Sequence, residues 1–170
     1  MHMNPSHCHW RAKRLNQTGV GLIEVLVALI IMSVGLLGIA SLYVTALQAK
    51  TTSLSRMKAV TLAQDMADRI RANSSVASAY AIAVSDTQTT LGNSQNCSGT
   101  TVTCTDTQMA LYDKYEWDKM IYDSSRGMNL PGQPTRSVTI SGSSPTIITI
   151  TLTWQEKSSG NLTYSMQIQV

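Results

Sequence analysis

The chain has 170 residues, of which 43% are hydrophobic and 14% are charged, so it suits one ordinary folded domain and is too short for two large ones. The net charge of +3 comes from Arg11, Lys13 and Arg14, because the remaining Lys and Arg residues equal the ten Asp and Glu residues in number. The rest of the chain therefore has no bulk charge that would attract nucleic acid.

Residues 22–42 form an almost uninterrupted apolar segment. A helix of about twenty residues crosses about 30 Å of hydrocarbon, so this segment is a candidate membrane span. The basic residues lie before it, which predicts a cytoplasmic amino terminus and a single pass. A secretory signal would have a shorter apolar region followed by a small-x-small cleavage site, and no such site is visible. We therefore expect the apolar segment to remain in the mature protein.

Glu24 is the one charged residue inside the apolar segment. An unpaired acid in hydrocarbon costs on the order of a few kcal/mol, which points to a functional role. The alternative is that Glu24 lies at the headgroup boundary and reaches water. Its position alone leaves both interpretations open.

The residues from Gln17 to Val25 resemble the type III signal of type IV prepilins, in which a short basic leader ends in Gly and the next segment is apolar with Glu at its fifth residue. The resemblance implies that a prepilin peptidase cuts between Gly19 and Val20 on the cytoplasmic side, which makes residues 1–19 a cleaved leader. It also implies methylation of the new Val20 amine. The ammonium would pair with Glu24 of its own chain or of a neighbour, and so set the stagger of subunits in a filament.

Helical periodicity continues beyond the apolar segment and predicts one helix from about residue 21 to 73, with residues 20–43 in the membrane or the filament core. Its second half is expected to be amphipathic and half-buried against a globular, extracytoplasmic head of residues 44–170. Gly35 and Gly38 permit either close helix contact or local melting. The expected apolar positions of the second half are Leu47, Leu54, Met57, Val60, Ala63, Met66, Ala67 and Ile70.

Arg69 and Arg71 lie at the end of this helix and invite a phosphate-binding interpretation. Asp65 and Asp68 neutralise them, however, and cations are favoured at a helix carboxyl end in any case. We therefore expect no nucleic-acid partner.

Residues 74–105 are rich in small and polar residues, with a short helix predicted at 76–84. Cys97 and Cys104, separated by six residues, suit a disulfide in an oxidising compartment, since the third cysteine, Cys8, lies in the leader. A metal site is the alternative, but every histidine is in the leader too, so this region supplies too few ligands. We expect neither a metal nor a cofactor.

The carboxyl third predicts a helix followed by a sheet. Asp106 is the expected cap of a helix over residues 107–122. From 136 to 170, apolar and polar residues alternate in three runs with turns at 142–145 and 158–161, which predicts three antiparallel strands with one face on the long helix. The predicted fold class is α+β, a ladle of the type IV pilin kind. The expected apolar contacts of the shorter helix are Met109, Leu111, Tyr112, Tyr115, Met120 and Ile121.

Five further blocks of the chain stand out beside the signal: Val34–Gly38, Asp65–Asn73, Tyr112–Trp117, Leu130–Gly132 and Thr151–Trp154. Together they are similar to the PilV minor pilin family. This resemblance implies a structural subunit, not an enzyme, that acts in the initiation and assembly of type IV pili. It would be held in the inner membrane and then enter an extracellular pilus at or near the tip. The implied partners are the prepilin peptidase, inner-membrane lipid, other minor pilins, the major pilin and a tip adhesin.

Two other classes remain as alternatives. A minor pseudopilin of a type II secretion system would share the signal and the long helix. A membrane-tethered enzyme or ligand-binding domain is less favoured, because the body of the chain has no His to act as a base. The clustered acids in the body of the chain lack the spacing of a calcium loop, and we expect them on a solvated helix face. They are Asp113, Glu116, Asp118 and Asp123.

Overall fold

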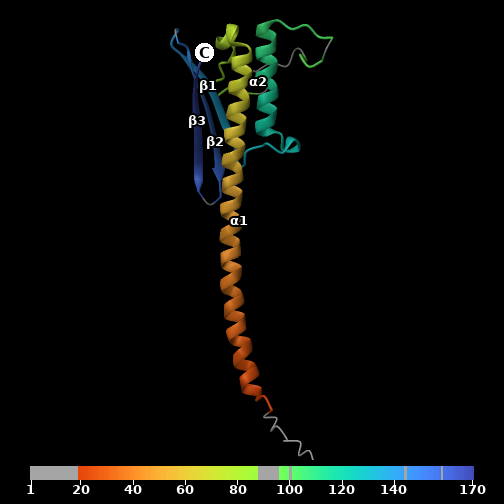
Figure 1. The fold of residues 1–170 in the computed structure, drawn as a ribbon, viewed down its shortest axis with the longest axis vertical. Helices are drawn as coiled ribbons and strands as arrows, with labels where there is room; N and C mark the ends of the chain where they lie inside the picture. Colours follow the sequence, from red (N-terminus) through yellow and green to blue (C-terminus); the bar gives the residue numbers. More distant parts are fainter. Residues whose placement is uncertain (1–18, 88–95, 100, 144, 158) are drawn as a thin grey trace, which may run out of the picture. The chain divides into compact units, whose positions relative to one another are not determined.

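The computed structural model describes residues 19–87, 96–99, 101–143, 145–157 and 159–170 (Figure 1). The chain divides into two compact units between Val44 and Thr45. We call residues 45–170 the head. The elements in chain order are the helix α1 (Leu22–Ala72), the 3-10 helix η1 (Ser74–Tyr80), the helix α2 (Asp106–Tyr122), the 3-10 helix η2 (Ser124–Arg126), and the strands β1 (Thr135–Ser141), β2 (Ile147–Glu156) and β3 (Gly160–Gln169).

Helix α1 begins and ends within one residue of the predicted bounds. No proline interrupts its 51 residues, so every backbone N–H after the first turn can bond within the helix. Arg69 and Arg71 lie in the last turn, where cations are favoured. The Asn73 N–H donates to the carbonyls of Arg69 and Ile70, both at 3.2 Å, and the helix stops there.

Within the head, α1 buries one face. Its small residues allow close packing, and its larger ones fill the core; the buried set is Ser55, Ala59, Leu62, Ala63, Met66, Ala67 and Ile70. The sequence prediction was wrong for Leu47, Leu54 and Met57, which are exposed. Five residues turn a helix by about 140°, so Leu54 and Met57 point far away from the direction of Ala59 and Leu62.

The segment after α1 differs from its prediction. The helix expected over residues 76–84 is a 3-10 helix only as far as Tyr80. Ile82 then forms an isolated antiparallel bridge with Val138 of β1, with backbone N–H···O distances of 3.0 and 2.9 Å. This bridge satisfies the backbone N–H and C=O groups of Ile82 and of Val138. A helix over residues 76–84 would leave those groups of Val138, at the edge of β1, without this partner.

Helix α2 starts at a different cap from the one predicted. Thr105, not Asp106, is the N-cap, and its hydroxyl oxygen accepts from the Gln108 N–H at 3.3 Å. The Gln108 side chain accepts from the Thr105 N–H at 2.9 Å, which completes a capping box. The predicted apolar contact Leu111 is exposed. The buried face of α2 carries Ala110, Asp113, Lys114, Trp117, Asp118 and Ile121.

The three strands form one antiparallel sheet in the order β1-β2-β3. Side chains alternate between two faces, so residues two apart share a face. The inner face contributes apolar residues to the core, namely Val138, Ile148, Ile150, Leu152, Trp154 and Ile168. The predicted fold class, a long amino-terminal helix with a small carboxyl-terminal antiparallel sheet, is confirmed.

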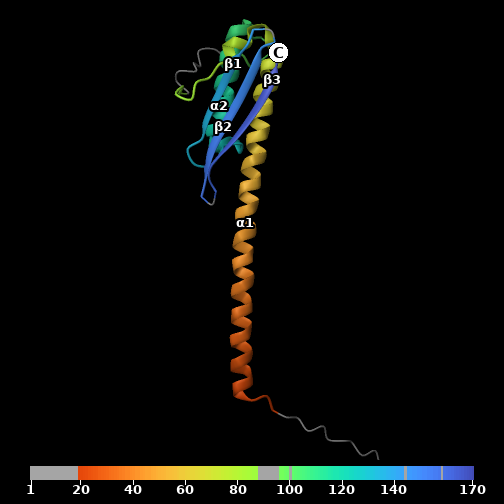
Figure 2. The same ribbon diagram turned by 90° about the vertical axis from the view of Figure 1, so that its left-hand side faces the viewer.

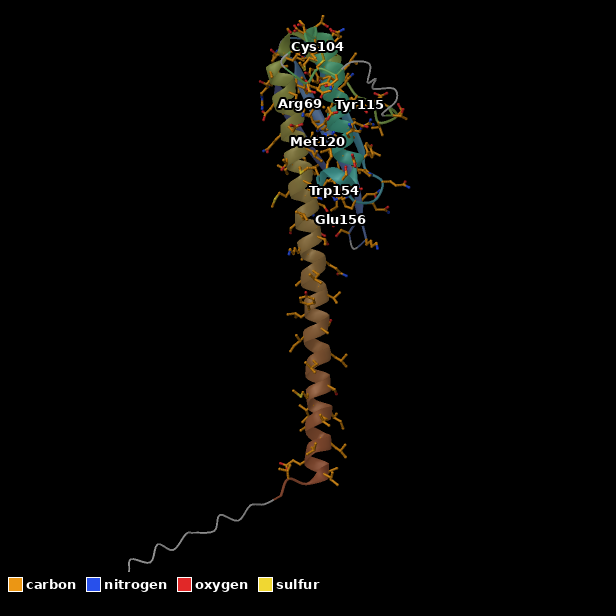
Figure 3. The ribbon with its side chains drawn as sticks, turned by 90° about the vertical axis from the view of Figure 1, so that its right-hand side faces the viewer. Arg69, Cys104, Tyr115, Met120, Trp154 and Glu156 are labelled. Carbon is orange, nitrogen blue, oxygen red and sulfur yellow. A yellow bond between two sulfur atoms is a disulfide. The ribbon has the colours of Figure 1, made fainter. Side chains whose placement is uncertain are left out.

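In the head, the sheet forms one layer, and α2 with the carboxyl half of α1 forms the other (Figures 1 and 2). The Trp117 indole N–H donates to the Leu62 carbonyl at 2.7 Å and so ties α2 to α1 inside the core. Arg69 and Glu156 lie toward opposite ends of this head (Figure 3). The buried hydrogen bond of Trp117 thus joins the two helices of this layer.

Candidate functional site

The amino half of α1 is an apolar surface that the described chain leaves uncovered. Every residue from Leu22 to Lys50 is exposed, and the exposed fractions of Leu22 and Leu37 are 87% and 72%. Helix α1 is the one described helix that is long and apolar enough to cross a membrane. Its residues 22–44 extend over about 35 Å, which matches the hydrocarbon core of a bilayer. Such a surface requires lipid or other helices around it instead of water.

The residues before α1 are accessible backbone. Gly19, Val20 and Gly21 lie outside the helix, and the Gly21 carbonyl accepts from the N–H groups of Glu24 at 3.0 Å and Val25 at 3.3 Å. A side-chain carbon at Gly19 would meet no described atom within 4 Å. The peptide bond between Gly19 and Val20, the predicted cleavage site, is therefore outside regular structure and open to a peptidase.

Glu24 is exposed in the first turn of α1, where an acid interacts favourably with the helix dipole. No described side chain bonds to it, and the next charged residue along the chain is Lys50. The carboxylate therefore stands alone on a surface that is otherwise suited to an apolar environment. An ionised carboxylate is costly once such a surface is covered, unless it pairs with a cation or gains a proton.

Two family models match the chain. Residues 14–40 match the prokaryotic N-terminal methylation motif, which covers Gly19, Val20 and Glu24. Residues 41–115 match the Tt1218-like family, described as type IV pilin Tt1218. Together the two matches support the interpretation of the chain as similar to type IV pilins. No curated protein and no solved structure matches the chain.

The methylation motif implies that this chain is processed by a prepilin peptidase and assembles with pilins. The single apolar helix fits membrane anchoring before assembly. Gly35 and Gly38 lie inside the continuous helix, and a side-chain carbon at either would meet no atom within 4 Å. Their small size thus leaves two notches on the uncovered surface of α1.

The head contains the predicted disulfide. Cys97 and Cys104 are joined, with their Cα atoms 6.0 Å apart. Cys104 directly precedes Thr105, so the bridge holds the surface loop against the start of α2. A disulfide persists in an oxidising compartment, which agrees with a head outside the cytoplasm.

The acids of α2 do not form the solvated face that the sequence predicted. Asp113 is buried; its carboxylate pairs with Arg69 at 2.8 Å and accepts from the Tyr80 hydroxyl at 2.6 Å. Burial and this carboxylate raise the pKa of Tyr80 well above its ordinary value. Arg69 also pairs with Asp65 at 2.8 Å, as the sequence predicted. These groups join α1, η1 and α2 and are not free to bind a ligand.

The other two acids of the predicted solvated face, Glu116 in α2 and Asp123 directly after it, also have partners. Glu116 pairs with Arg126 at 2.8 Å and with Lys119 at 3.4 Å. Asp123 caps the 3-10 helix η2 by accepting from the Ser125 N–H at 2.9 Å. Among the described residues, no group of three or more potential metal ligands occurs. The geometry gives no support for a calcium site in this part of the head.

A buried ion pair that the sequence prediction missed connects α2 to the sheet. Asp118 and Arg136 are only 1% and 3% exposed, and their side chains meet at 2.5 Å. Arg136 also donates to the Asp86 carbonyl at 2.7 Å and lies 5.6 Å from the centre of the Tyr122 ring. Burial raises the pKa of Asp118, although Arg136 opposes that shift. Asp118 and Arg136 line a cavity of about 320 Å³. The carboxylate and the guanidinium pair with each other there.

Proposed function

We propose that this chain is a minor pilin of the PilV family that acts in the initiation and assembly of type IV pili. It is held in the inner membrane with its amino terminus in the cytoplasm, and it then enters the pilus at or near the tip. The observation that carries this proposal is Glu24. It is an exposed acid at the start of a helix surface whose next 25 residues carry no charge.

Processing gives that acid its partner. A prepilin peptidase cuts between Gly19 and Val20 and methylates the Val20 amine, which remains cationic. A carboxylate and an ammonium in an apolar bundle attract strongly, whereas either one alone is costly. Glu24 therefore selects subunits whose amino termini lie in register with it, in its own chain or in a neighbour.

The rest of the chain supplies the assembly context. Lipid surrounds the amino half of α1 before assembly, and helices of other minor pilins and of the major pilin replace that lipid in the filament. A tip adhesin is the proposed partner beyond the head. The finer assignment is supported by the resemblance of Asp65–Asn73, Tyr112–Trp117 and Thr151–Trp154 to the PilV family. The function is structural and involves no cofactor or nucleic acid.

The test is the Glu24→Val variant, expressed in place of the wild-type chain. It should be cut and inserted normally, but its amount in sheared filaments should fall on the order of a hundredfold, because an unpaired charge costs about 3 kcal/mol or more. Quantitative mass spectrometry of membranes and of sheared filaments measures both. The matched control is Asp68→Asn, which removes an acid that is 75% exposed and pairs only with Arg71 in the head.

The same measurement separates the alternatives. Wild-type incorporation of Glu24→Val would contradict the pairing. A mature terminus other than Val20 would contradict the cleavage site. Recovery of the wild-type chain with secretion pseudopilins, and not with pilus subunits, would assign it to a type II secretion pseudopilus.

A further inference from the structure

Strand β3 is a sheet edge without the usual protection. Edge strands in native proteins are normally kept from pairing with other chains by charges, proline, bulges or short length. Residues 158–170 contain no charged residue and no proline. The strand is ten residues long, and its pairing with β2 is unbroken from Gly160 to Gln169. β3 is therefore a long, regular and neutral edge.

The pairing pattern shows which backbone groups face outward. Thr146 and Val170 exchange both backbone hydrogen bonds, at 3.2 and 3.1 Å. Hydrogen-bonded and non-bonded pairs alternate along an antiparallel ladder, so Ile168, Met166, Tyr164 and Leu162 also bond to β2. The backbone groups of the residues between them point away from β2; these are Asn161, Thr163, Ser165, Gln167 and Gln169. No described backbone group outside the sheet bonds to them.

The opposite edge of the sheet is different. On β1, the outward backbone groups of Val138 bond to Ile82, and the neighbouring inward side chain is the charged Arg136, which is tied to α2. The chain after η1 thus covers part of the β1 edge (Figure 1). Only the β3 edge combines unpaired backbone groups with a neutral sequence among the described strands.

The side chains of β3 also fit an additional strand. On the inner face, Leu162, Tyr164 and Met166 are only partly buried, unlike their β2 partners Trp154, Leu152 and Ile150 in the core. On the outer face, polar neutral side chains bond across the strands; the pairs are Thr153 with Thr163 at 3.0 Å, Thr151 with Ser165 at 3.2 Å and Thr149 with Gln167 at 3.3 Å. A fourth strand would complete the apolar cover and extend this polar row.

We propose that the β3 edge binds an extended segment of a neighbouring pilin subunit of different sequence as a fourth strand. That segment alternates apolar residues, over Leu162, Tyr164 and Met166, with uncharged polar ones. The class of partner rests on the proposed function, whereas the edge itself follows from the pairing and the sequence. A second copy of this chain is disfavoured, because two β3 edges would form a closed two-fold pair that cannot continue along a filament.

The test places a photo-crosslinking amino acid at Gln169, beside the open edge, in cells that express the full chain. Two variants block the edge in different ways. Ser165→Pro removes an outward N–H without loss of a backbone bond to β2, although its side-chain bond to Thr151 is lost. Thr163→Lys with Gln167→Lys places charges along the edge. The matched control is Ser137→Lys with Thr139→Lys, which adds the same charges to the same face on β1. A crosslinker at the exposed Thr139 is the position control.

The proposal expects an adduct from Gln169, and none from Thr139, to an extended segment of another pilin. Both edge variants should reduce it at least about tenfold, the effect of about 1.4 kcal/mol, while the β1 control should not. An unchanged adduct in the edge variants, no adduct, or an adduct with a second copy overturns the proposal. An adduct in membranes from a chain that is absent from sheared filaments would support the edge and refute the pilus function. Incorporation of the chain into filaments without an adduct from Gln169 would support the pilus function and refute the proposed use of the β3 edge.

Discussion

The two halves of α1 have the same secondary structure and opposite surroundings. From Leu22 to Lys50 every residue is exposed and the sequence is almost free of charge. From Ser55 to Ile70 one face is buried in the head, and the other carries paired charges such as Arg71 with Asp68 at 3.0 Å. One helix thus buries apolar side chains within the head in its second half and leaves them exposed in its first half.

This difference shows where each half acquires its constraints. In the second half, the packed core of the head constrains the buried side chains of α1. In the first half, the apolar side chains and Glu24 have no described partner, so their requirements must be met by lipid and by other subunits. The two halves should therefore respond to different experiments.

The largest expected effect is at the start of the first half. Gly19→Ala should leave the precursor uncut, visible as a larger band in membranes, because the prepilin signal that this leader resembles ends in Gly. The structure offers no folding reason for such a loss, since a side-chain carbon at Gly19 meets no described atom within 4 Å. Gly35→Ala, which is equally unobstructed, is the control for processing. Normal maturation of Gly19→Ala would place the cut elsewhere.

The next effect compares one substitution in the two halves. Leu62→Ala removes a side chain that is 1% exposed and should destabilise the head by about 2–5 kcal/mol. Leu37→Ala removes one that is 72% exposed and should leave the unfolding of the head within about 0.5 kcal/mol of wild type. Denaturation of the full chain in detergent measures both, followed by the fluorescence of the buried Trp117 and Trp154. A destabilised head in Leu37→Ala would show that the halves are coupled.

The sequence predicted the periodic features well, for physical reasons. The apolar alternation gave the three strands, and the unbroken apolar and helical pattern gave α1, because period alone distinguishes these elements. It missed the interior charges, although Arg136 and Glu156 share the inward parity of Val138 and Trp154 on their strands. Charge suggested solvent exposure, whereas in the structure Asp118 and Thr52 supply partners from distant segments. Such partners are set by tertiary packing.

The smallest expected effect tests the join between β2 and α1 in the head. Glu156 is buried at the end of β2 and accepts from the Thr52 hydroxyl of α1 and from the Trp154 indole N–H (Figure 3). Burial acts to raise the pKa of Glu156, but these hydrogen bonds outweigh it and hold the pKa below its ordinary value of 4.5. The ionised carboxylate therefore stabilises the fold above about pH 4.5, and this contribution is lost as the pH falls through the lowered pKa.

Glu156→Gln should for this reason lower the melting temperature of the head at pH 7 by a few degrees, and the gap to wild type should close as the pH falls from about 4.5 to 3. Melting curves of the full chain in detergent across this range measure the gap. A gap that stays constant would mean that the carboxylate charge contributes nothing at this join and that only its shape matters. A gap that widens on acidification would reverse the sign of the pKa shift. Either result would contradict a stabilising role of the ionised Glu156 carboxylate at this join.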